Sequence, residues 1–177
     1  LAVTPMVVGE EGVKLNIDVQ IDDPAQVGAD RLVNAVAVAA AGDVPAIILD
    51  FGTATTFDVI RPAAPDSDVS AIYAGGVIAP GVHRSVEALV NAAAKLPSLT
   101  VENFDPDLPV LGTSTQSAMK SGVLWGYVGL IDGLLSRLKA EPGMAEAVVI
   151  GTGGLASLFA QHIDAIDKVD EALTMNG

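Results

Sequence analysis

Acidic and hydroxyl side chains gather in one short stretch of the sequence, residues 50–58. Asp50 follows the apolar run 45–49, and Gly52 and three threonines come after it. The run is short, rich in β-branched residues and bounded by glycine, which predicts two strands joined by a tight turn. Such a turn suits a phosphate, because glycine exposes backbone N–H groups and threonine adds hydroxyl donors, while the carboxylate suits a hard cation. The alternative is an ordinary β-turn whose threonines reflect strand propensity.

A second candidate is the adjacent pair Asp30 and Arg31. Asp23-Pro24 is typical of a helix start, and Gly42 is typical of its end. Residues 32–41 are almost all apolar, so we expect a helix buried between layers, with the charged pair where burial begins. A carboxylate there can accept a hydroxyl proton and a guanidinium can bind a carboxylate through two bonds. The alternative is a structural ion pair at a helix start.

A glycine-rich turn, residues 151–154, follows the apolar run 147–150 and precedes a helix expected to begin near Leu155. A strand, a glycine turn and a helix N-terminus together can hold an anion or a nucleotide. The alternative is a tight connection with no ligand.

The longest expected helix spans residues 114–139. An apolar stripe runs along it, formed by Met119, Val123, Tyr127, Leu130, Leu134 and Leu138. Gly122, Gly126, Gly129 and Gly133 define another side with almost no side-chain bulk. Each glycine costs a helix about 1 kcal/mol relative to alanine, so we expect a second helix or subunit to pack closely against this side.

The remaining segments complete an α/β pattern. Residues 13–19 alternate at period two and predict a strand, and residues 61–68 predict a surface loop. Residues 71–81 predict a strand whose internal glycine pair marks a bulge or a close backbone approach. A helix is expected at 82–94, with Val86, Leu89, Val90 and Ala93 toward the core, followed by an ordered loop at 95–110.

Composition excludes several classes of protein. The 177 residues carry a net charge of -13 without a basic cluster, which argues against nucleic-acid binding. There is no cysteine and hence no disulfide or thiolate zinc site, and no signal peptide precedes the first strand, so we expect a cytoplasmic protein. The longest uncharged apolar stretch, 121–131, is too short to span a bilayer.

Several motifs along the chain carry a family resemblance. They are Val27-Gly28-Ala29-Asp30-Arg31, Asp50-Phe51-Gly52-Thr53-Ala54-Thr55-Thr56, Gly75-Gly76-Val77-Ile78-Ala79-Pro80-Gly81, Ala94-Lys95-Leu96-Pro97, Ser121-Gly122-Val123 with Gly126-Tyr127-Val128-Gly129, and Thr152-Gly153-Gly154. Together they resemble the type III pantothenate kinases of the acetate and sugar kinase, Hsp70 and actin superfamily, over essentially the whole chain.

The resemblance implies a ribonuclease H-like α/β fold with a mixed sheet flanked by helices. Residues 1–42 would be the remainder of a first domain and a linking helix, and residues 43–177 a second domain. The implied activity is ATP-dependent phosphorylation of pantothenate to 4'-phosphopantothenate, the first step of coenzyme A biosynthesis. The implied partner is a second copy of the chain, through the glycine-faced helix 114–139.

Residue roles follow from the same resemblance. Asp30 would be the general base, and Gly28, Ala29, Asp30 and Arg31 would contact pantothenate. Thr115 would also contact it, although the family's usual Asn-Thr pair is Ser114-Thr115 here. Asp50 would bind a monovalent cation, potassium or ammonium, and magnesium would arrive with ATP. The ATP contacts would be Thr53 with phosphate and Gly153 and Gly154 with adenosine.

One family feature is missing from these residues. The superfamily's first phosphate loop, an Asp-x-Gly-Asn-Thr-like motif, is absent from the sequence. We therefore expect a fragment of a kinase that is inactive alone. The alternatives are a non-catalytic binding or regulatory relative of the same fold and, less in keeping with the Gly-Ala-Asp-Arg motif, another small-molecule kinase.

Overall fold

The computed structural model describes residues 15–92, 97–101, 104–105 and 107–177. In chain order its elements are β1 (Ile17–Val19), a 3-10 turn η1 (Pro24–Gln26), α1 (Ala29–Ala41), β2 (Ala46–Phe51), β3 (Ala54–Pro62), β4 (Ala71–Pro80), α2 (Val82–Ala92), α3 (Thr115–Lys139), β5 (Val148–Gly153), α4 (Ala156–Phe159), β6 (Lys168–Val169) and α5 (Leu173–Asn176).

The strands form one mixed sheet in the order β1-β4-β3-β2-β5-β6. Strands β2, β3 and β4 are antiparallel neighbours, whereas β5 runs parallel to β2, β6 parallel to β5, and β1 parallel to β4. The register places Asp50 of β2 between Thr56 of β3 and Thr152 of β5. The expected mixed α/β architecture is therefore confirmed.

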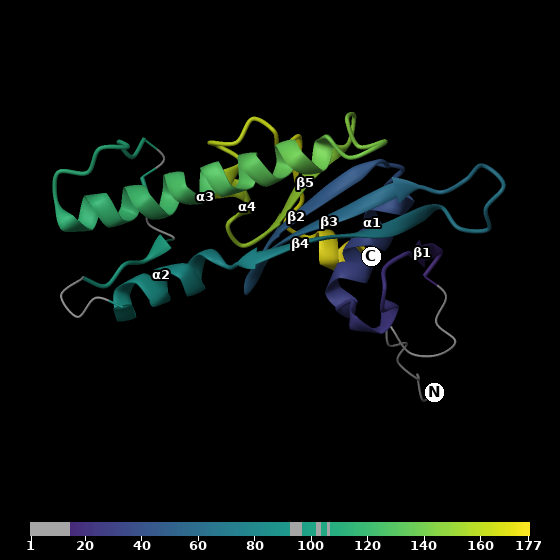
Figure 1. Ribbon diagram of the computed structural model, residues 1–177, viewed down its shortest axis with the longest axis horizontal. Helices are drawn as coiled ribbons and strands as arrows, with labels where there is room; N and C mark the ends of the chain where they lie inside the picture. Colours follow the sequence, from purple (N-terminus) through teal and green to yellow (C-terminus); the bar gives the residue numbers. More distant parts are fainter. Residues whose placement is uncertain (1–14, 93–96, 102–103, 106) are drawn as a thin grey trace.

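Helices cover both faces of this sheet (Figure 1). On one face α1 and α5 bury Ile48, Ile60 and Ile150. On the other face α3 and α4 bury the alternate residues of β2, among them Leu49 and Phe51. The strands β2 and β5 are thus apolar on both faces, as expected for strands buried between helical layers.

The helix α1 begins later than expected. The predicted start at Pro24 is wrong, because Asp23 caps only the single turn η1 and the chain is extended at Val27 and Gly28 before α1 starts. Its end is as expected: Gly42 adopts φ 76°, a left-handed conformation that suits glycine. Asp30 and Arg31 consequently occupy the first turn of α1.

The predicted hairpin is confirmed, with β2 and β3 joined by residues 52 and 53. The predicted bulge lies in β4, where Ala74 and Gly75 together face a single residue of β3. A Cβ on the next residue, Gly76, would lie 1.8 Å from the carbonyl oxygen of Phe57. The close approach at this glycine is therefore to the neighbouring strand and leaves no room for a ligand.

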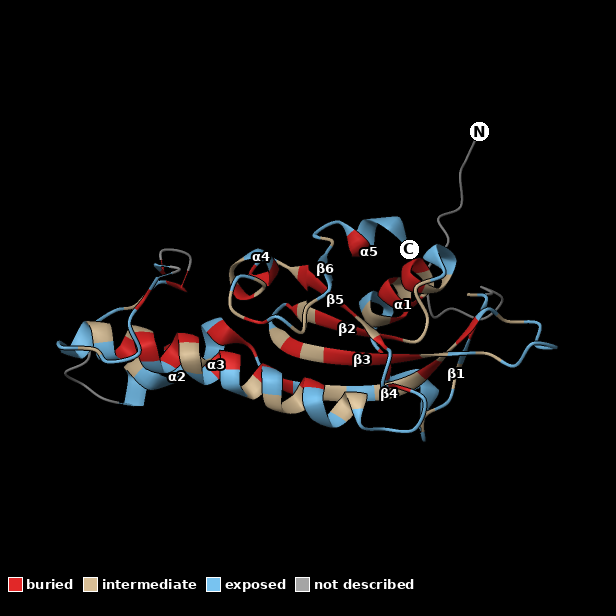
Figure 2. Cartoon of the chain, turned by 90° about the horizontal axis from the view of Figure 1, so that it is seen from above, coloured by how far each residue is buried: buried red, intermediate tan, exposed pale blue. Residues whose placement is uncertain are grey.

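The long helix α3 has the expected bounds. Ser114 caps its N-terminus and exchanges hydrogen bonds with Ser117 in a capping box. Met119, Val123 and Tyr127 of the apolar stripe are buried, whereas Leu130, Leu134 and Leu138 are half-buried. The opposite side of α3 is open to solvent in this chain (Figure 2), and a Cβ on Gly122, Gly126 or Gly129 would meet nothing within 4 Å.

The remaining elements are close to expectation. The first strand is shorter than predicted, with β1 limited to Ile17–Val19 and residues 13 and 14 outside the described chain. In α2, Val86 is buried as expected, but Leu89 is exposed, and Ala93 lies outside the described residues. No helix in the described part of the chain is long and apolar enough to cross a membrane.

Candidate active site

Charged side chains meet where the first turns of α1 cross the end of β2. Asp30 and Arg31 lie in the first turn of α1, and Asn34 lies one turn further along the helix. Asp50 near the end of β2 and Asp58 on β3 belong to the sheet face that α1 covers. The sequence folds this way because β2 places alternate residues on opposite faces, so the acidic residue falls beneath the helix.

The strongest interaction in this cluster joins Arg31 to Asp58. Arg31 Nε donates a hydrogen bond to Asp58 Oδ1 at 2.8 Å, and Arg31 Nη2 forms an ion pair with the same oxygen at 2.6 Å. The hydroxyl of Tyr73 donates to this oxygen as well, at 2.6 Å. Thr56 Oγ1 donates to Asp58 Oδ2 at 3.4 Å, and the Arg31 guanidinium lies 5.7 Å from the centre of the Tyr73 ring.

Burial sets the protonation of this network. It raises the pKa of Asp58, while the hydrogen bonds from Arg31, Tyr73 and Thr56 act to lower it. It also raises the pKa of Tyr73, and the bond to Asp58 adds to that rise. For Arg31, burial acts to lower the pKa, but the hydrogen bond and the charge of Asp58 raise it on balance. Arg31 therefore stays cationic and Tyr73 stays protonated at neutral pH.

Asp50 has a different environment. Its Oδ2 accepts a hydrogen bond from Asn34 Nδ2 at 3.5 Å. Burial raises the pKa of Asp50, and the negative charges of Asp30 and Asp58 raise it further. A carboxylate held in this way gains from a bound cation, which would offset both the lost hydration and the repulsion.

The residues around Asp50 offer several oxygen atoms and little side-chain bulk. Asp50 Oδ1 faces a glycine cradle, because a Cβ on Gly153 would lie only 2.7 Å from it and one on Gly52 only 3.7 Å. Thr56 and Thr152, its register neighbours, add hydroxyl groups on both sides. No group of three or more acidic, histidine or cysteine residues that could hold a metal ion occurs among the described residues. Asp50 and the neighbouring hydroxyl groups are oxygen donors of the kind that hard cations prefer.

The turn after β2 lies beside a cavity of about 270 Å³. Gly52 and Thr53 line it together with His83, Arg84 and Glu87 of the first turns of α2. The β4–α2 connection packs directly against this turn. The packing is so close that a Cβ on Gly81 would lie 2.2 Å from the carbonyl oxygen of Thr53. Thr53 is thus exposed on a supported turn, beside this cavity.

The late glycines end β5 rather than forming a separate turn. Gly153 is the last residue of β5, pairs with Phe51 and has φ 85°, and Gly154 is exposed with no atom within 4 Å of an added Cβ. The predicted glycine turn is therefore wrong in its start: β5 continues through Gly153, and the turn begins three residues later than expected, at Gly154. The helix that follows is the four-residue α4, which begins directly after Leu155.

Comparison with known proteins identifies the family of this chain. The sequence model of type III pantothenate kinase matches residues 1–137. A type III pantothenate kinase from Rhodospirillum centenum is 48% identical over 177 residues, covering 98% of this chain and 64% of the relative. Another, from Paramagnetospirillum magneticum, is 49% identical over 173 residues, covering 98% and 62%. The chain belongs to the type III pantothenate kinase family.

The chain spans less than two thirds of the length of these family members. A type III pantothenate kinase from Exiguobacterium sp. is 49% identical over 175 residues and is covered to 64%. Among solved structures, a protein from Campylobacter jejuni named as a Baf family transcriptional activator aligns with a TM-score of 0.53 and 21% identity, over 81% of this chain and 59% of that one. That similarity supports the fold alone.

The structure brings most residues predicted from the kinase family into one region, but not Thr115. Gly28, Ala29, Asp30 and Arg31 form the start of α1 above Asp50. Thr115 is the first residue of α3, and that end of the helix lies at the far end of the molecule from α1 (Figure 1). Within one chain Thr115 therefore has no part in the cluster around Asp50.

Three residues of this cluster were not predicted: Asn34, Asp58 and Tyr73. Each has a polar side chain in a mostly apolar segment, and this pattern in the sequence could have identified them. Asn34 interrupts the apolar run of α1, and Asp58 interrupts β3 two residues after Thr56. A buried polar residue in an apolar strand or helix needs a partner, and that need points to a site.

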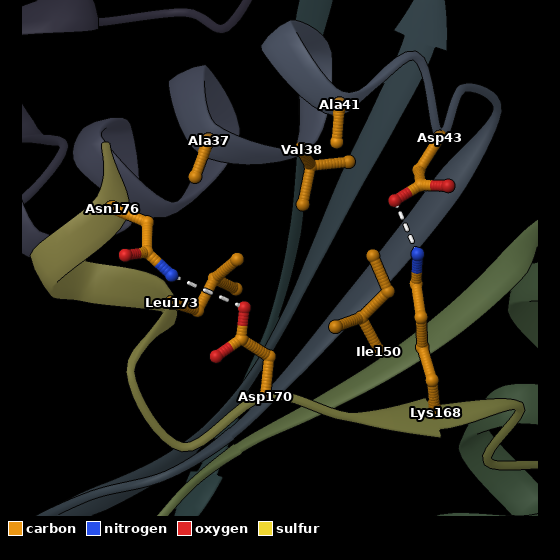
Figure 3. Close-up of a pocket in the computed structure, with 9 residues that line it drawn as sticks. All are labelled: Ala37, Val38, Ala41, Asp43, Ile150, Lys168, Asp170, Leu173 and Asn176. Atoms are coloured by element: carbon orange, nitrogen blue, oxygen red, sulfur yellow. Dashed lines mark hydrogen bonds and ion pairs between the residues drawn. The ribbon is translucent and has the colours of Figure 1, made fainter.

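A further cavity, of about 230 Å³, lies elsewhere, between α1, β5, β6 and α5 (Figure 3). Val38 and Ile150 lie on its apolar side, while Lys168 contacts Asp43 and Asn176 donates a hydrogen bond to Asp170. None of the site residues predicted from the kinase family lines it.

Proposed function

We propose that the full-length protein containing this chain transfers phosphate from ATP to pantothenate and forms 4'-phosphopantothenate, the first step of coenzyme A biosynthesis. The observation that carries this proposal is the meeting of Asp30, Arg31 and Asp50 at one end of the sheet in a chain of the type III pantothenate kinase family. Phosphoryl transfer needs positioning, neutralisation of charge and an acceptor for the hydroxyl proton, and these side chains supply such groups.

Asp30 is the proposed general base. Its side chain is exposed in the first turn of α1, where a substrate hydroxyl can reach it. A Cβ on Gly28 would lie 2.5 Å from Asp30 Oδ1, so glycine at this position leaves room for the carboxylate. The backbone of Gly28 and Ala29 and the guanidinium of Arg31 would hold the other polar groups of pantothenate.

Asp50 is the proposed ligand of a monovalent cation, potassium or ammonium. Its raised pKa, which a bound positive charge would lower, and the glycine cradle at Oδ1 support a cation there. Bound beside the reacting phosphate, such a cation would neutralise developing negative charge. Magnesium would enter with ATP, held chiefly by the phosphates.

The proposed ATP contacts lie on either side of Asp50. Thr53, exposed on the β2–β3 turn, would donate to a phosphate oxygen. Gly153 and Gly154, at the end of β5, would lie under adenosine, and the open space at Gly154, where an added Cβ would meet nothing within 4 Å, supports room for a flat base.

The fold is proposed to be the ribonuclease H-like one of the acetate and sugar kinase, Hsp70 and actin superfamily. The antiparallel strands β2, β3 and β4 followed by the parallel strands β5 and β6 support this proposal. We also propose that residues 1–42 belong to a first domain and its linking helix, and residues 43–177 to the second domain.

The proposed assembly is a homodimer through α3. Its side formed by Gly122, Gly126 and Gly129 is exposed and unobstructed, which would allow close approach of a second helix. In such a dimer Thr115, distant from α1 of its own chain, would reach the pantothenate site of the second subunit.

The test is turnover by the full-length protein and its Asp30→Asn variant. Wild-type protein is expected to release ADP only when pantothenate is present. Because a general base contributes about 10²–10⁴-fold to rate, Asp30→Asn is expected to lower kcat by that factor while ATP binding, measured by calorimetry, stays near wild type. Wild-type protein without pantothenate-dependent ADP release would refute the function, and an active Asp30→Asn variant would refute only the assignment of the base.

A further inference from the structure

The Asp58 carboxylate is the most enclosed charged group near the site. Its side chain is 0% exposed and that of Arg31 is 16% exposed. Three donor atoms from α1 and β4, namely Arg31 Nε, Arg31 Nη2 and the Tyr73 hydroxyl, point at the single oxygen Oδ1. The three side chains therefore form one connected unit that fixes the start of α1 to the sheet.

Stability alone does not account for this arrangement. Burying a carboxylate and a guanidinium costs several kcal/mol of hydration per ion, and an apolar pair of similar volume commonly stabilises a fold as well or better. Arg31 lies beside the proposed base Asp30, at the open end of the cluster. This position indicates that the network orients the guanidinium so that it can bind a substrate.

The contacts with Asp58 involve only one edge of the Arg31 guanidinium. One edge of the guanidinium, formed by Nε and Nη2, is directed at Asp58. The edge formed by Nη1 and the second proton of Nη2 makes no hydrogen bond within the described residues. A planar guanidinium held at one edge presents the other in a fixed direction, and two parallel N–H donors match a carboxylate.

We propose that Asp58, together with Tyr73, is a positioning residue that directs the free edge of Arg31 toward the carboxylate of the substrate. This inference rests on the proposed function, since it assigns the binding of the pantothenate carboxylate to a guanidinium whose orientation is fixed from beneath. It makes Asp58 and Tyr73 determinants of specificity for an acidic substrate, although neither contacts that substrate.

The test compares pantothenate with its neutral amide, in which –CONH₂ replaces the carboxylate, on the full-length protein. For wild-type protein, kcat/KM is expected to be higher for the acid. Tyr73→Phe, which removes one hydrogen bond and keeps the ring, is expected to lower kcat/KM for the acid about tenfold through KM. Asp58→Asn is expected to lower it about a hundredfold. The amide is expected to change by less than threefold in both variants, as is the KM for ATP.

Tyr127→Phe is the matched control. The Tyr127 hydroxyl is also buried and hydrogen-bonded, to the Pro80 carbonyl at 2.9 Å, but on the opposite face of the sheet. Its loss is expected to leave the ratio of kcat/KM values for acid and amide at the wild-type value. Thermal unfolding of each variant shows whether it is folded, and Tyr73→Phe provides the test if Asp58→Asn does not fold.

Each outcome is decisive for the positioning role. A selective loss for the acid in Tyr73→Phe supports it. Equal losses for acid and amide, or no loss, overturn it and leave the network purely structural. Failure of the proposed function is a separate result, visible as wild-type protein that releases no ADP with either compound. In that case calorimetry measures the binding of pantothenate and of its amide without ATP. Weaker binding of pantothenate but not of the amide in Tyr73→Phe would still support the positioning role, and equal changes would overturn it.

Discussion

Ionisation of the Asp50 carboxyl is less favourable in the folded protein than in the unfolded chain. Burial raises its pKa, and Asp30 and Asp58 raise it further. The folded protein therefore holds this proton more tightly than the unfolded chain does. The resulting stability is fully present below the unfolded pKa, near 3.8, and is lost as pH rises through the higher folded pKa. Ionising this carboxylate therefore costs folding stability.

Asp50→Asn is expected to stabilise the full-length protein at pH 7 and to have little effect near pH 4. The amide has the same size, can still accept the Asn34 hydrogen bond and carries no charge. The measurement is urea unfolding across this pH range with tetramethylammonium as the buffer cation, so that no bound potassium stabilises the wild type. A variant that is less stable than wild type at pH 7 would show that the charge is already compensated within the protein.

Gly153 and Gly154 provide a matched pair of substitutions at the end of β5. Gly153 has φ 85°, and an added Cβ would lie 2.7 Å from both Asp50 Oδ1 and the Phe51 carbonyl oxygen. Gly153→Ala is therefore expected to reduce the free energy of unfolding by about 2 kcal/mol or more. Gly154→Ala, with nothing near its Cβ, should change it by less than about 0.5 kcal/mol.

Denaturant unfolding of the two alanine variants side by side measures this difference. Equal effects at both positions would show that the backbone at Gly153 relaxes easily, and would remove the steric argument for a glycine cradle beside Asp50.

At the scale of elements, α3 combines an apolar stripe with a bare side. Gly126 lies at the middle of that side, is exposed, and an added Cβ there would meet nothing within 4 Å among the described residues. If α3 packs against a second copy as proposed, Gly126→Leu is expected to convert the full-length protein from dimer to monomer at micromolar concentration, since leucine prevents close helix approach.

Sedimentation velocity checks this prediction, and Ala88→Leu is the control. Ala88 is exposed on α2, so leucine there adds the same bulk away from the proposed interface. A Gly126→Leu protein that remains dimeric would place the interface elsewhere.

The elements that local chemistry determines were predicted from the sequence. The β2–β3 hairpin, the end of α1 at Gly42 and the bounds of α3 follow from glycine positions, apolar periodicity and a serine cap. The start of α1 was mispredicted because Asp23-Pro24 caps a single 3-10 turn, and an extended Gly28 delays the helix. Helix starts compete locally, and tertiary packing decides between them.

The network of Asp58, Tyr73 and Arg31 could not be predicted in the same way. Asp58 and Tyr73 approach each other through the register of β3 and β4, which the bulge at Gly75 shifts. Arg31 reaches them only because α1 lies across that face of the sheet. Register and helix placement depend on the whole fold, so the polar interruptions in the apolar segments indicated a need for partners without naming them.

In the whole molecule, the sheet separates a charged cluster from the larger apolar core. The face under α1 carries Asp50 and Asp58 together with the charged start of that helix. The face under α3 is an apolar core, and the side of α3 that points away from this core carries glycines with almost no side-chain bulk. Thr115 lies far from α1 in its own chain (Figure 1), so its proposed contact with pantothenate depends on the proposed dimer. Assembly and catalysis are therefore linked through α3 in this account.

The most direct measurement is pantothenate-dependent ADP release by the full-length protein, first with potassium and then with tetramethylammonium in its place. We expect turnover that requires pantothenate, falls at least tenfold when potassium is withdrawn, and loses this potassium dependence in Asp50→Ala. Pantothenate-dependent turnover that is indifferent to potassium would contradict the role of Asp50. No pantothenate-dependent turnover from the folded protein in either buffer would contradict the proposed kinase activity itself.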